Sequence, residues 1–215
     1  MIFILLIYRL SWLIPNGENM RQMFSFRVFT SILLVFCFGL FNPALSATSV
    51  HVGASSYSIT GQSALILTAE MDSKGPVGQD GQRHPAKTKW DLQWRFKQKE
   101  SNAECTVESI GISLGITHTK PVWRDQKPAS LALIDRWASF ENALIKIQEY
   151  HADLALQAAS EIEERVLKVT PQKSCEELEV MIGAIVYNIK EKYRKLKADY
   201  EIRTNYGRRS GLNLM

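Results

Sequence analysis

The sequence predicts an α+β fold in which a β-rich first half is followed by two long helices. From Thr48 to about Trp123, short strand-like runs alternate with turn residues. From Ser130 to Asn205 the only helix-breaking residues are Pro171 and Gly183. A content of 46% hydrophobic and 22% charged residues is that of an ordinary globular protein. Strands that precede helices in this way favour a sheet packed on a helical layer.

The first part of this domain is expected to hold two short strands and a short helix. Val50–Val52 and Tyr57–Ile59 have strand composition, and Gln62–Met71 contains no helix breaker. The Gly- and Pro-rich segment 74–81 then predicts a loop.

An antiparallel β-hairpin is expected to follow this loop. In Ala86–Phe96, alternate residues are large or β-branched, which predicts one buried face, and these residues are Thr88, Trp90, Leu92, Trp94 and Phe96. A polar turn over Gln98–Glu104 leads to a second strand, Cys105–Thr119. Gly111 and Gly115 in this strand indicate possible bulges.

Two long helices are expected to complete the fold. Pro121 and Pro128 bracket the crossing to the helical half, and Ser130 is a candidate N-cap for a helix that runs to about Lys168. After Pro171, Ser174 and Glu177 form a capping-box pattern that begins the second helix. Its apolar positions are spaced by three and four residues and predict one buried stripe, namely Leu178, Met181, Ile182, Ile185, Ile189, Tyr193, Leu196 and Tyr200. The two helices should pack antiparallel.

Residues 1–47 resemble a secretory signal peptide rather than a part of the fold. The apolar run Val28–Leu40 follows Arg21 and Arg27 and ends before the small residues of segment 42–47. A membrane-spanning helix needs roughly 20 apolar residues, so an uncleaved anchor is the less favoured alternative. Because Met20 and Met23 each open a conventional signal peptide, we interpret residues 1–19 as upstream sequence from a start codon placed too early. We therefore expect a single exported domain over residues 48–215, in the periplasm or outside the cell, without a stable membrane anchor.

The cysteines agree with export. Cleavage would remove Cys37 and leave Cys105 and Cys175, an even pair in a compartment that permits oxidation. We predict that these two are bonded to each other.

Net charge identifies no partner. The chain has a formal net charge of +4, and because residues 1–47 hold three basic residues and one acidic residue, the remainder carries +2. The basic stretch Lys190–Lys197 is interleaved with carboxylates at helical spacing, which favours a solvated helix face over a nucleic-acid site.

His151 is the only one of the four histidines expected on a long helix. Its window, Ile147–His151, reads IQEYH. A zinc protease of the zincin type requires His-Glu-x-x-His on a helix, because residues four apart point the same way and the intervening Glu activates the metal-bound water. Taken alone, a single helical histidine is more often a packed or surface residue than a metal ligand.

A wider set of residues, in order along the chain, resembles the bacterial secreted family called domain of unknown function 922. The set is Gly75-Pro76, Gly81, Ala86-x-Thr88-x-Trp90-x-x-x-Trp94, Cys105, Pro121-x-Trp123, Trp137, His151, Cys175 and Tyr200-Glu201-x-x-Thr204-x-x-Gly207. The family is described as predicted secreted zinc-dependent proteases. The resemblance implies a zincin-like domain with His-Glu-x-x-His and a further histidine before the late glycine.

At the matching positions this chain holds different residues. The two ligand histidines and the intervening glutamate fall on Ile147, His151 and Gln148, and the late histidine falls on Tyr206. Isoleucine cannot bind zinc, and a catalytic zinc normally has three protein ligands. Glutamine cannot accept a proton as a general base. We therefore expect no catalytic residue, no metal and no cofactor, and a vestigial site at these four positions.

The leading hypothesis is a non-catalytic pseudoenzyme that binds an unknown envelope protein or peptide, or has a structural role. The alternative is an envelope peptidase or hydrolase with a nonstandard site around Gln148, His151 and Tyr206. We expect Ile147, Gln148 and His151 to face Tyr206 across a shallow groove. If so, Ile147→His, Gln148→Glu and Tyr206→His together should restore zinc binding, whereas any one alone should not.

Overall fold

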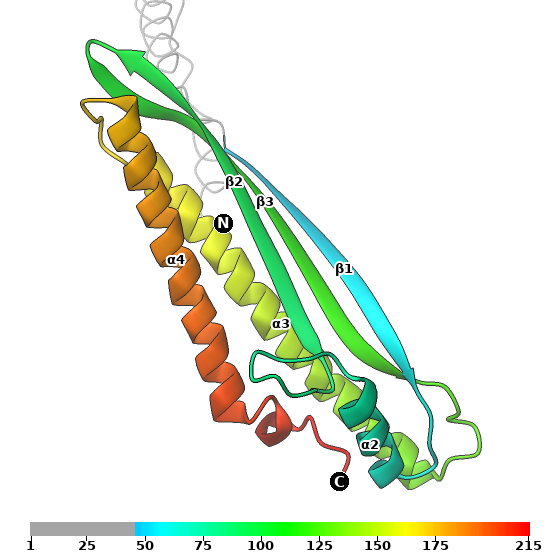
Figure 1. The fold of residues 1–215 in the computed structure, drawn as a ribbon. Coiled ribbons are helices and arrows are strands. Elements are labelled where there is room, and N and C mark those ends of the chain that lie inside the picture. Colours follow the sequence, from blue (N-terminus) through cyan, green and yellow to red (C-terminus); the bar gives the residue numbers. More distant parts are fainter. Residues whose placement is uncertain (1–45) are drawn as a thin grey trace, which may run out of the picture. The chain divides into compact units, whose positions relative to one another are not determined.

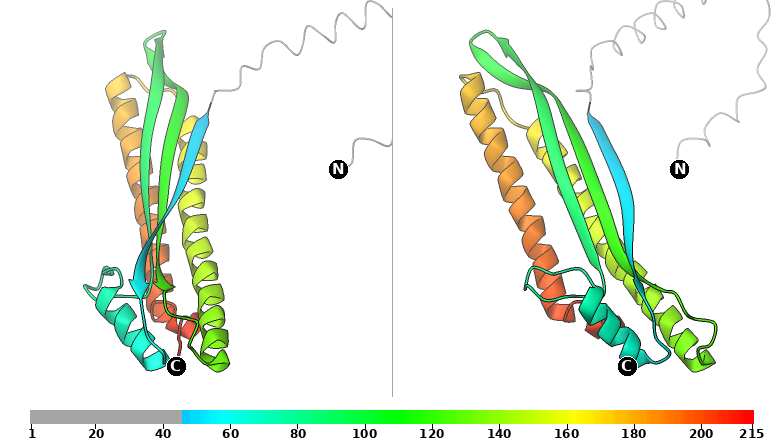
Figure 2. Two further views of the ribbon diagram at one scale, coloured as in Figure 1. Left: turned by 90° about the vertical axis from the view of Figure 1, so that its right-hand side faces the viewer. Right: turned by 45° about the vertical axis from the view of Figure 1, so that its right-hand side comes forward.

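The fold is a three-stranded sheet with two long helices on one face. The computed structural model describes residues 46–215, and most of the predicted signal peptide lies outside these residues. The order of elements is α+β as expected, with strands and a short helix before the long helices (Figure 1). Both long helices lie on the same side of the sheet, so the molecule has one sheet layer and one helix layer (Figure 2).

The sheet has the strand order β1-β3-β2. β2 (Lys87–Ser101) and β3 (Glu104–Trp123) form the predicted antiparallel hairpin. Its turn consists of Asn102 and Ala103, both with positive φ (53° and 60°), as a two-residue hairpin turn requires. The turn is shorter than the expected segment 98–104 because both strands continue almost to it.

β1 departs from the prediction. Two short strands were expected, but Ala47–Ile59 is one continuous strand that pairs parallel with β3. The partner strand β3 extends along its full length and offers backbone groups opposite every residue, including the small residues 53–56 that separate the two apolar runs. The continuous pairing edge therefore overrides the local break in composition.

Two further details of the hairpin differ from the prediction. The register shifts between Lys97 and Gln98 of β2, so the residue of β3 left without a partner is Glu108, not Gly111 or Gly115. β3 also continues through Pro121, which was expected to lie outside it. Beyond Thr119, β3 pairs with β1 alone, so one side of its backbone can accommodate a residue that lacks an N–H group.

The helices begin at serine caps. In α2 (Ala64–Lys74) the Ser63 side chain accepts a hydrogen bond from the Ile66 amide, so this helix lies slightly later than the expected Gln62–Met71. α3 (Leu131–Leu167) is capped by Ser130 and α4 (Cys175–Thr204) by Ser174, both as predicted. Each of these caps satisfies an amide that has no partner within its helix.

α3 and α4 pack side by side and antiparallel (Figure 1). Half of the predicted stripe of α4 is buried, namely Leu178, Ile182, Ile189 and Tyr193. Ile185 and Tyr200 are half-buried, and Met181 and Leu196 are each 39% exposed. Two residues outside the predicted stripe, Val186 and Lys197, are also buried, and Lys197 is only 9% exposed. The burial of a lysine was not expected from the basic stretch, which otherwise includes the exposed Lys192, Arg194 and Lys195.

The predicted disulfide is confirmed. Cys105 at the start of β3 and Cys175 at the start of α4 are bonded, with 5.1 Å between their Cα atoms. Cys105 also exchanges two backbone hydrogen bonds with Gln172. The bridge joins the β-rich half of the chain to the second long helix.

The core consists of two apolar clusters along α3. The first lies between β2, β3, the second half of α3 and α4, from Leu154 to Val166 along α3. The second lies between α2, Trp123, the first half of α3 and the C-terminal tail, from Leu133 to Ile147 along α3. Gln148 and His151 are buried where one cluster ends and the other begins. This polar junction is the candidate site.

Candidate functional site

α3 contributes Ile147, Gln148 and His151 to the junction, 9%, 8% and 4% exposed. His151 lies three residues after Gln148 and four after Ile147, so a helix places it on the same face as each of them. These three residues and Tyr206 line one small pocket of about 40 Å³ between α3, the start of β2 and the segment after α4. The four positions singled out in the sequence therefore lie around the same cavity.

The backbone after α4 is held in an uncommon conformation that places Tyr206. Asn205, Tyr206 and Gly207 have φ values of 49°, 54° and 87°. Asn and Gly tolerate this left-handed region, whereas it costs a residue such as tyrosine about 1–2 kcal/mol. At Gly207 a Cβ atom would lie 2.6 Å from Ile147 Cδ1, so the tail can approach α3 only with glycine here.

His151 is a neutral imidazole in this pocket. Burial, together with the smaller effects of the nearby charges of Lys197 and His118, lowers its pKa to about 4. Its Nε2 lies 3.9 Å from Glu201 Oε1, beyond hydrogen-bond distance. Its Nδ1 is buried and has no hydrogen-bond partner among the described residues. Buried polar atoms are rarely left in this state in native proteins.

Lys197 places a positive charge beside His151. Its ammonium group donates a hydrogen bond to the Thr88 carbonyl at 2.8 Å and lies 3.6 Å from Glu201 Oε1, the same oxygen that faces His151. Gln148 donates its amide to the Thr119 carbonyl at 3.5 Å. The junction thus combines one fixed cation, one carboxylate and one neutral imidazole.

A loop that the sequence analysis did not connect with the site forms its outer wall. In segment 75–86, Asp80 oxygens lie 3.0 Å from His84 Nε2, and the His84 ring stacks on Tyr206 with centroids 3.8 Å apart. The hydrogen bond to His84 and, to a smaller extent, the one donated by the Gln82 amide lower the pKa of Asp80. Gly75 and Gly78 permit this arrangement, because a Cβ atom at either would overlap His84.

This loop, β2 and α4 enclose a second, larger pocket of about 320 Å³. The two pockets share five lining residues, so they are neighbouring parts of one site: Ala86, Lys87, Thr88, Glu201 and Tyr206. Below, they are called the inner pocket (about 40 Å³) and the outer pocket (about 320 Å³).

A family model described as bacterial protein of unknown function (DUF922) matches residues 54–207. The chain belongs to this family. The match extends from β1 to Gly207, and so includes every residue that lines the inner pocket except Leu212 of the tail. Neither the curated proteins nor the solved structures include a match to this chain.

Two further observations concern the described part of the chain. Within residues 46–215, no three His, Cys, Asp or Glu side chains are grouped so that they could hold a metal ion. No helix among these residues combines the length and hydropathy needed to cross a membrane.

Proposed function

We propose that this protein is an exported, non-catalytic member of its family that binds a ligand in the inner and outer pockets. The observation that carries the proposal is the composition of the inner pocket. Ile147, Gln148, His151 and Tyr206 lie around it, and the Lys197 ammonium reaches the carboxylate that faces His151.

The charge of Lys197 opposes a metal at this position. A divalent cation bound to His151 would lie close to a fixed ammonium group that is itself almost completely buried. Repulsion between like charges is strong where water is largely excluded. Ile147 offers no ligand atom, so the metal would also lack the second helical ligand that a zincin requires.

Gln148 replaces the general base that a zincin also requires. Its amide donates to the Thr119 carbonyl, so it is held in place by a hydrogen bond that a carboxylate could not make. An amide does not accept a proton at neutral pH, and general-base activation of water therefore has no agent at this position.

The pocket has the properties of a binding site. His151 Nδ1 is buried and lacks a partner in the described part of the chain, and Tyr206 is held in a strained conformation. Strain and unsatisfied polar groups concentrate at sites that bind or act on ligands. A volume of about 40 Å³ exceeds the roughly 10–15 Å³ that one water needs, so a small polar group of a ligand can enter the inner pocket.

Export is supported by the disulfide. Cys105 and Cys175 are bonded, and such bonds persist in oxidising compartments outside the cytoplasm. We infer that residues 1–47 direct the chain there and are removed, and that the mature protein acts in the periplasm or the medium. The expected binding partner is a peptide or another envelope protein.

Zinc content and peptidase activity of the purified, disulfide-bonded protein test this proposal. We expect zinc far below one equivalent per chain and no hydrolysis of an unstructured protein such as casein. About one zinc per chain, together with peptidase activity that a chelator removes, would overturn it.

An envelope hydrolase with a nonstandard site is the second candidate, and the Asp80–His84 pair favours it. A carboxylate that orients an imidazole is an arrangement found in general bases. This pair stacks on Tyr206 in the wall of the outer pocket. If the protein hydrolyses peptide or cell-wall material without zinc, His84→Gln should abolish the activity, whereas His51→Gln on the exposed β1 strand should not.

A further inference from the structure

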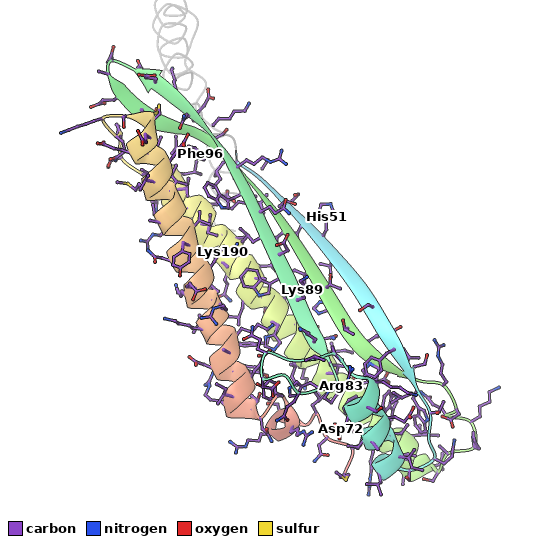
Figure 3. The ribbon with its side chains drawn as sticks, viewed as in Figure 1. His51, Asp72, Arg83, Lys89, Phe96 and Lys190 are labelled. Atoms are coloured by element: carbon purple, nitrogen blue, oxygen red, sulfur yellow. A yellow bond between two sulfur atoms is a disulfide. The ribbon has the colours of Figure 1, made fainter. Side chains whose placement is uncertain are left out.

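The outer pocket has an excess of positive charge. Five basic and two acidic residues line it, which gives a formal net charge of +3 when histidine is not counted. The basic residues come from two elements, Lys87 and Lys89 from β2 and Lys190, Arg194 and Lys197 from α4. Figure 3 labels Lys190 and Lys89, which approach the pocket from these two elements.

The two carboxylates in the lining already have partners. Glu191 accepts two hydrogen bonds from the Arg194 guanidinium, at 3.0 Å from Nε and 2.9 Å from Nη2. Glu201 lies 3.6 Å from the Lys197 ammonium. The remaining lysines, 87, 89 and 190, have no carboxylate partner among the residues described.

Backbone carbonyls fix two of these lysines without neutralising them. Lys87 donates to the Val77 carbonyl at 2.6 Å, and Lys190 donates to the Leu92 carbonyl at the outer edge of β2 at 3.5 Å. An ammonium group has three donors, so each keeps two for a ligand. The positive charges are therefore held at the pocket in advance of binding, which lowers the entropy cost of ordering them.

The rest of the lining includes three aromatic rings. Trp90 is half-buried, and the rings of His84 and Tyr206 stack on each other. A volume of about 320 Å³ lies at the lower end of the range for small-molecule sites, roughly 300–1,000 Å³. The pocket is of a size for one ring or short side chain together with one acidic group.

We propose that the outer pocket binds a small anionic group, a carboxylate or a phosphate, attached to a compact apolar or aromatic body. This rests on the proposed binding function and names the chemistry of the ligand. The free carboxylate at the C-terminus of a peptide and a phosphate monoester both supply that chemistry. A long polyanion fits less well, because the exposed Lys192 outside the pocket is paired with Glu161 and does not extend the positive surface.

Binding of matched small probes to the purified, disulfide-bonded protein tests the proposal by calorimetry at low salt. N-acetylphenylalanine and its amide differ only in the negative charge, and phenyl phosphate separates a phosphate ligand from a carboxylate one. At least one of the two anions should bind, and the amide should bind at least about tenfold more weakly than the acid if the ligand is a carboxylate. Whichever anion binds more tightly identifies the source of the acidic group.

Substitutions locate the binding. The double variant Lys89→Gln/Lys190→Gln should weaken binding of the preferred anion at least about tenfold. The control Lys173→Gln/Lys195→Gln removes the same two charges at exposed positions outside the pocket lining, and it should leave the affinity unchanged. Equal losses in both variants would show only a general attraction to a basic surface and would overturn the assignment.

Three other results would also overturn the assignment of an anion site to the outer pocket. The first is equal binding of the acid and its amide with no binding of phenyl phosphate, and the second is no binding of either anion up to about 10 mM. The third is tight binding of heparin with no binding of the small anions. These outcomes are distinct from a failure of the proposed function. A protein free of zinc and peptidase activity that ignores both anions loses only this ligand class, whereas zinc-dependent hydrolysis would remove the non-catalytic proposal itself.

Discussion

The disulfide-bonded end of the molecule and the polar junction in the middle of α3 differ in what fills them. Around Cys105 and Cys175 the first apolar cluster is closed, with Ile162, Leu178 and Ile182 fully buried. At the junction, buried polar side chains replace apolar ones. Among residues 46–215 there are five such side chains, and all of them line the inner or the outer pocket: His84, Thr88, Gln148, His151 and Lys197.

This difference separates stability from ligand chemistry. Buried polar groups without full hydrogen bonding cost free energy, and a protein keeps them where they contact a ligand. The disulfide end should therefore dominate the free energy of unfolding, while the junction should respond to pH and to ligands. Each of the following predictions compares the two regions.

The largest effect on stability should come from loss of the disulfide. Cys105 and Cys175 are 70 residues apart, and the chain-entropy model gives about 4 kcal/mol for a loop of this size. We expect the double variant Cys105→Ala/Cys175→Ala to lose about that much free energy of unfolding in a urea titration. The intact protein with reductant added should show the same loss, and a change below about 1 kcal/mol would place the main source of stability elsewhere.

Two isoleucines on α3 should respond differently to the same truncation. Ile162 is fully buried in the first cluster, whereas Ile147 borders the inner pocket. We expect Ile162→Ala to lower the free energy of unfolding by about 4 kcal/mol and Ile147→Ala by about 2 kcal/mol. Truncation of Ile162 creates a cavity in a closed core, whereas truncation of Ile147 only enlarges a void that already exists. Urea titrations of both variants measure the difference, and equal losses would show that the junction is packed as tightly as the core.

The junction should make stability depend on pH. Burial, Lys197 and His118 lower the pKa of His151 to about 4, below the ordinary value near 6.5. Between about pH 6.5 and pH 4 the unfolded chain therefore binds a proton at this residue that the folded chain does not. The protein should lose up to about 3 kcal/mol as pH falls through this window.

His151→Gln should remove most of this loss, measured as unfolding free energies at about pH 7 and about pH 4.5. In this variant a smaller loss of stability toward low pH should remain, because burial also lowers the pKa of His118. Lys197 and Glu201 are the charged groups nearest to His151. His51→Gln on the exposed β1 strand is the matched control and should leave the wild-type curve unchanged.

The smallest effect concerns the start of α4. The Ser174 hydroxyl accepts a hydrogen bond from the Glu177 amide at 3.2 Å. Ser174→Ala should cost about 1 kcal/mol in the urea titration because that amide loses its partner. The control Ser160→Ala, at an exposed position within α3, should leave the free energy of unfolding unchanged. If Ser174→Ala also left it unchanged, the disulfide alone would fix the start of α4.

Local patterns predicted most of the fold. Alternation in β2, serine caps and breaker-free segments identify elements through interactions within a few residues, and the hairpin and both long helices follow from them. The disulfide followed instead from the two cysteines that remain once Cys37 is removed with the signal peptide. The parallel pairing of β1 could not be predicted in this way. It depends on the length of β3, a partner more than 50 residues away along the chain.

The candidate site was predicted only in part for a similar reason. The positions on α3 and Tyr206 followed from the family resemblance, and the structure places them around one pocket. Lys197 lies in a stretch whose alternating charges indicate a solvated face, and only the proximity of the Thr88 carbonyl explains its burial. Asp80 and His84 lie in a loop whose fold depends on close packing at two glycines, for which the composition alone gives no signal.

Zinc bound per chain by redesigned variants tests most directly whether a few side chains at the junction decide its chemistry. The variant Ile147→His/Gln148→Glu/Tyr206→His supplies three histidine ligands and a general base, and adding Lys197→Met removes the opposing charge. After dialysis against a weak chelator, we expect about one zinc per chain in the variant with four substitutions. The variant with three should retain less, and the wild type none. A variant with four substitutions that keeps its disulfide and helical circular dichroism signal but binds no zinc would contradict the account.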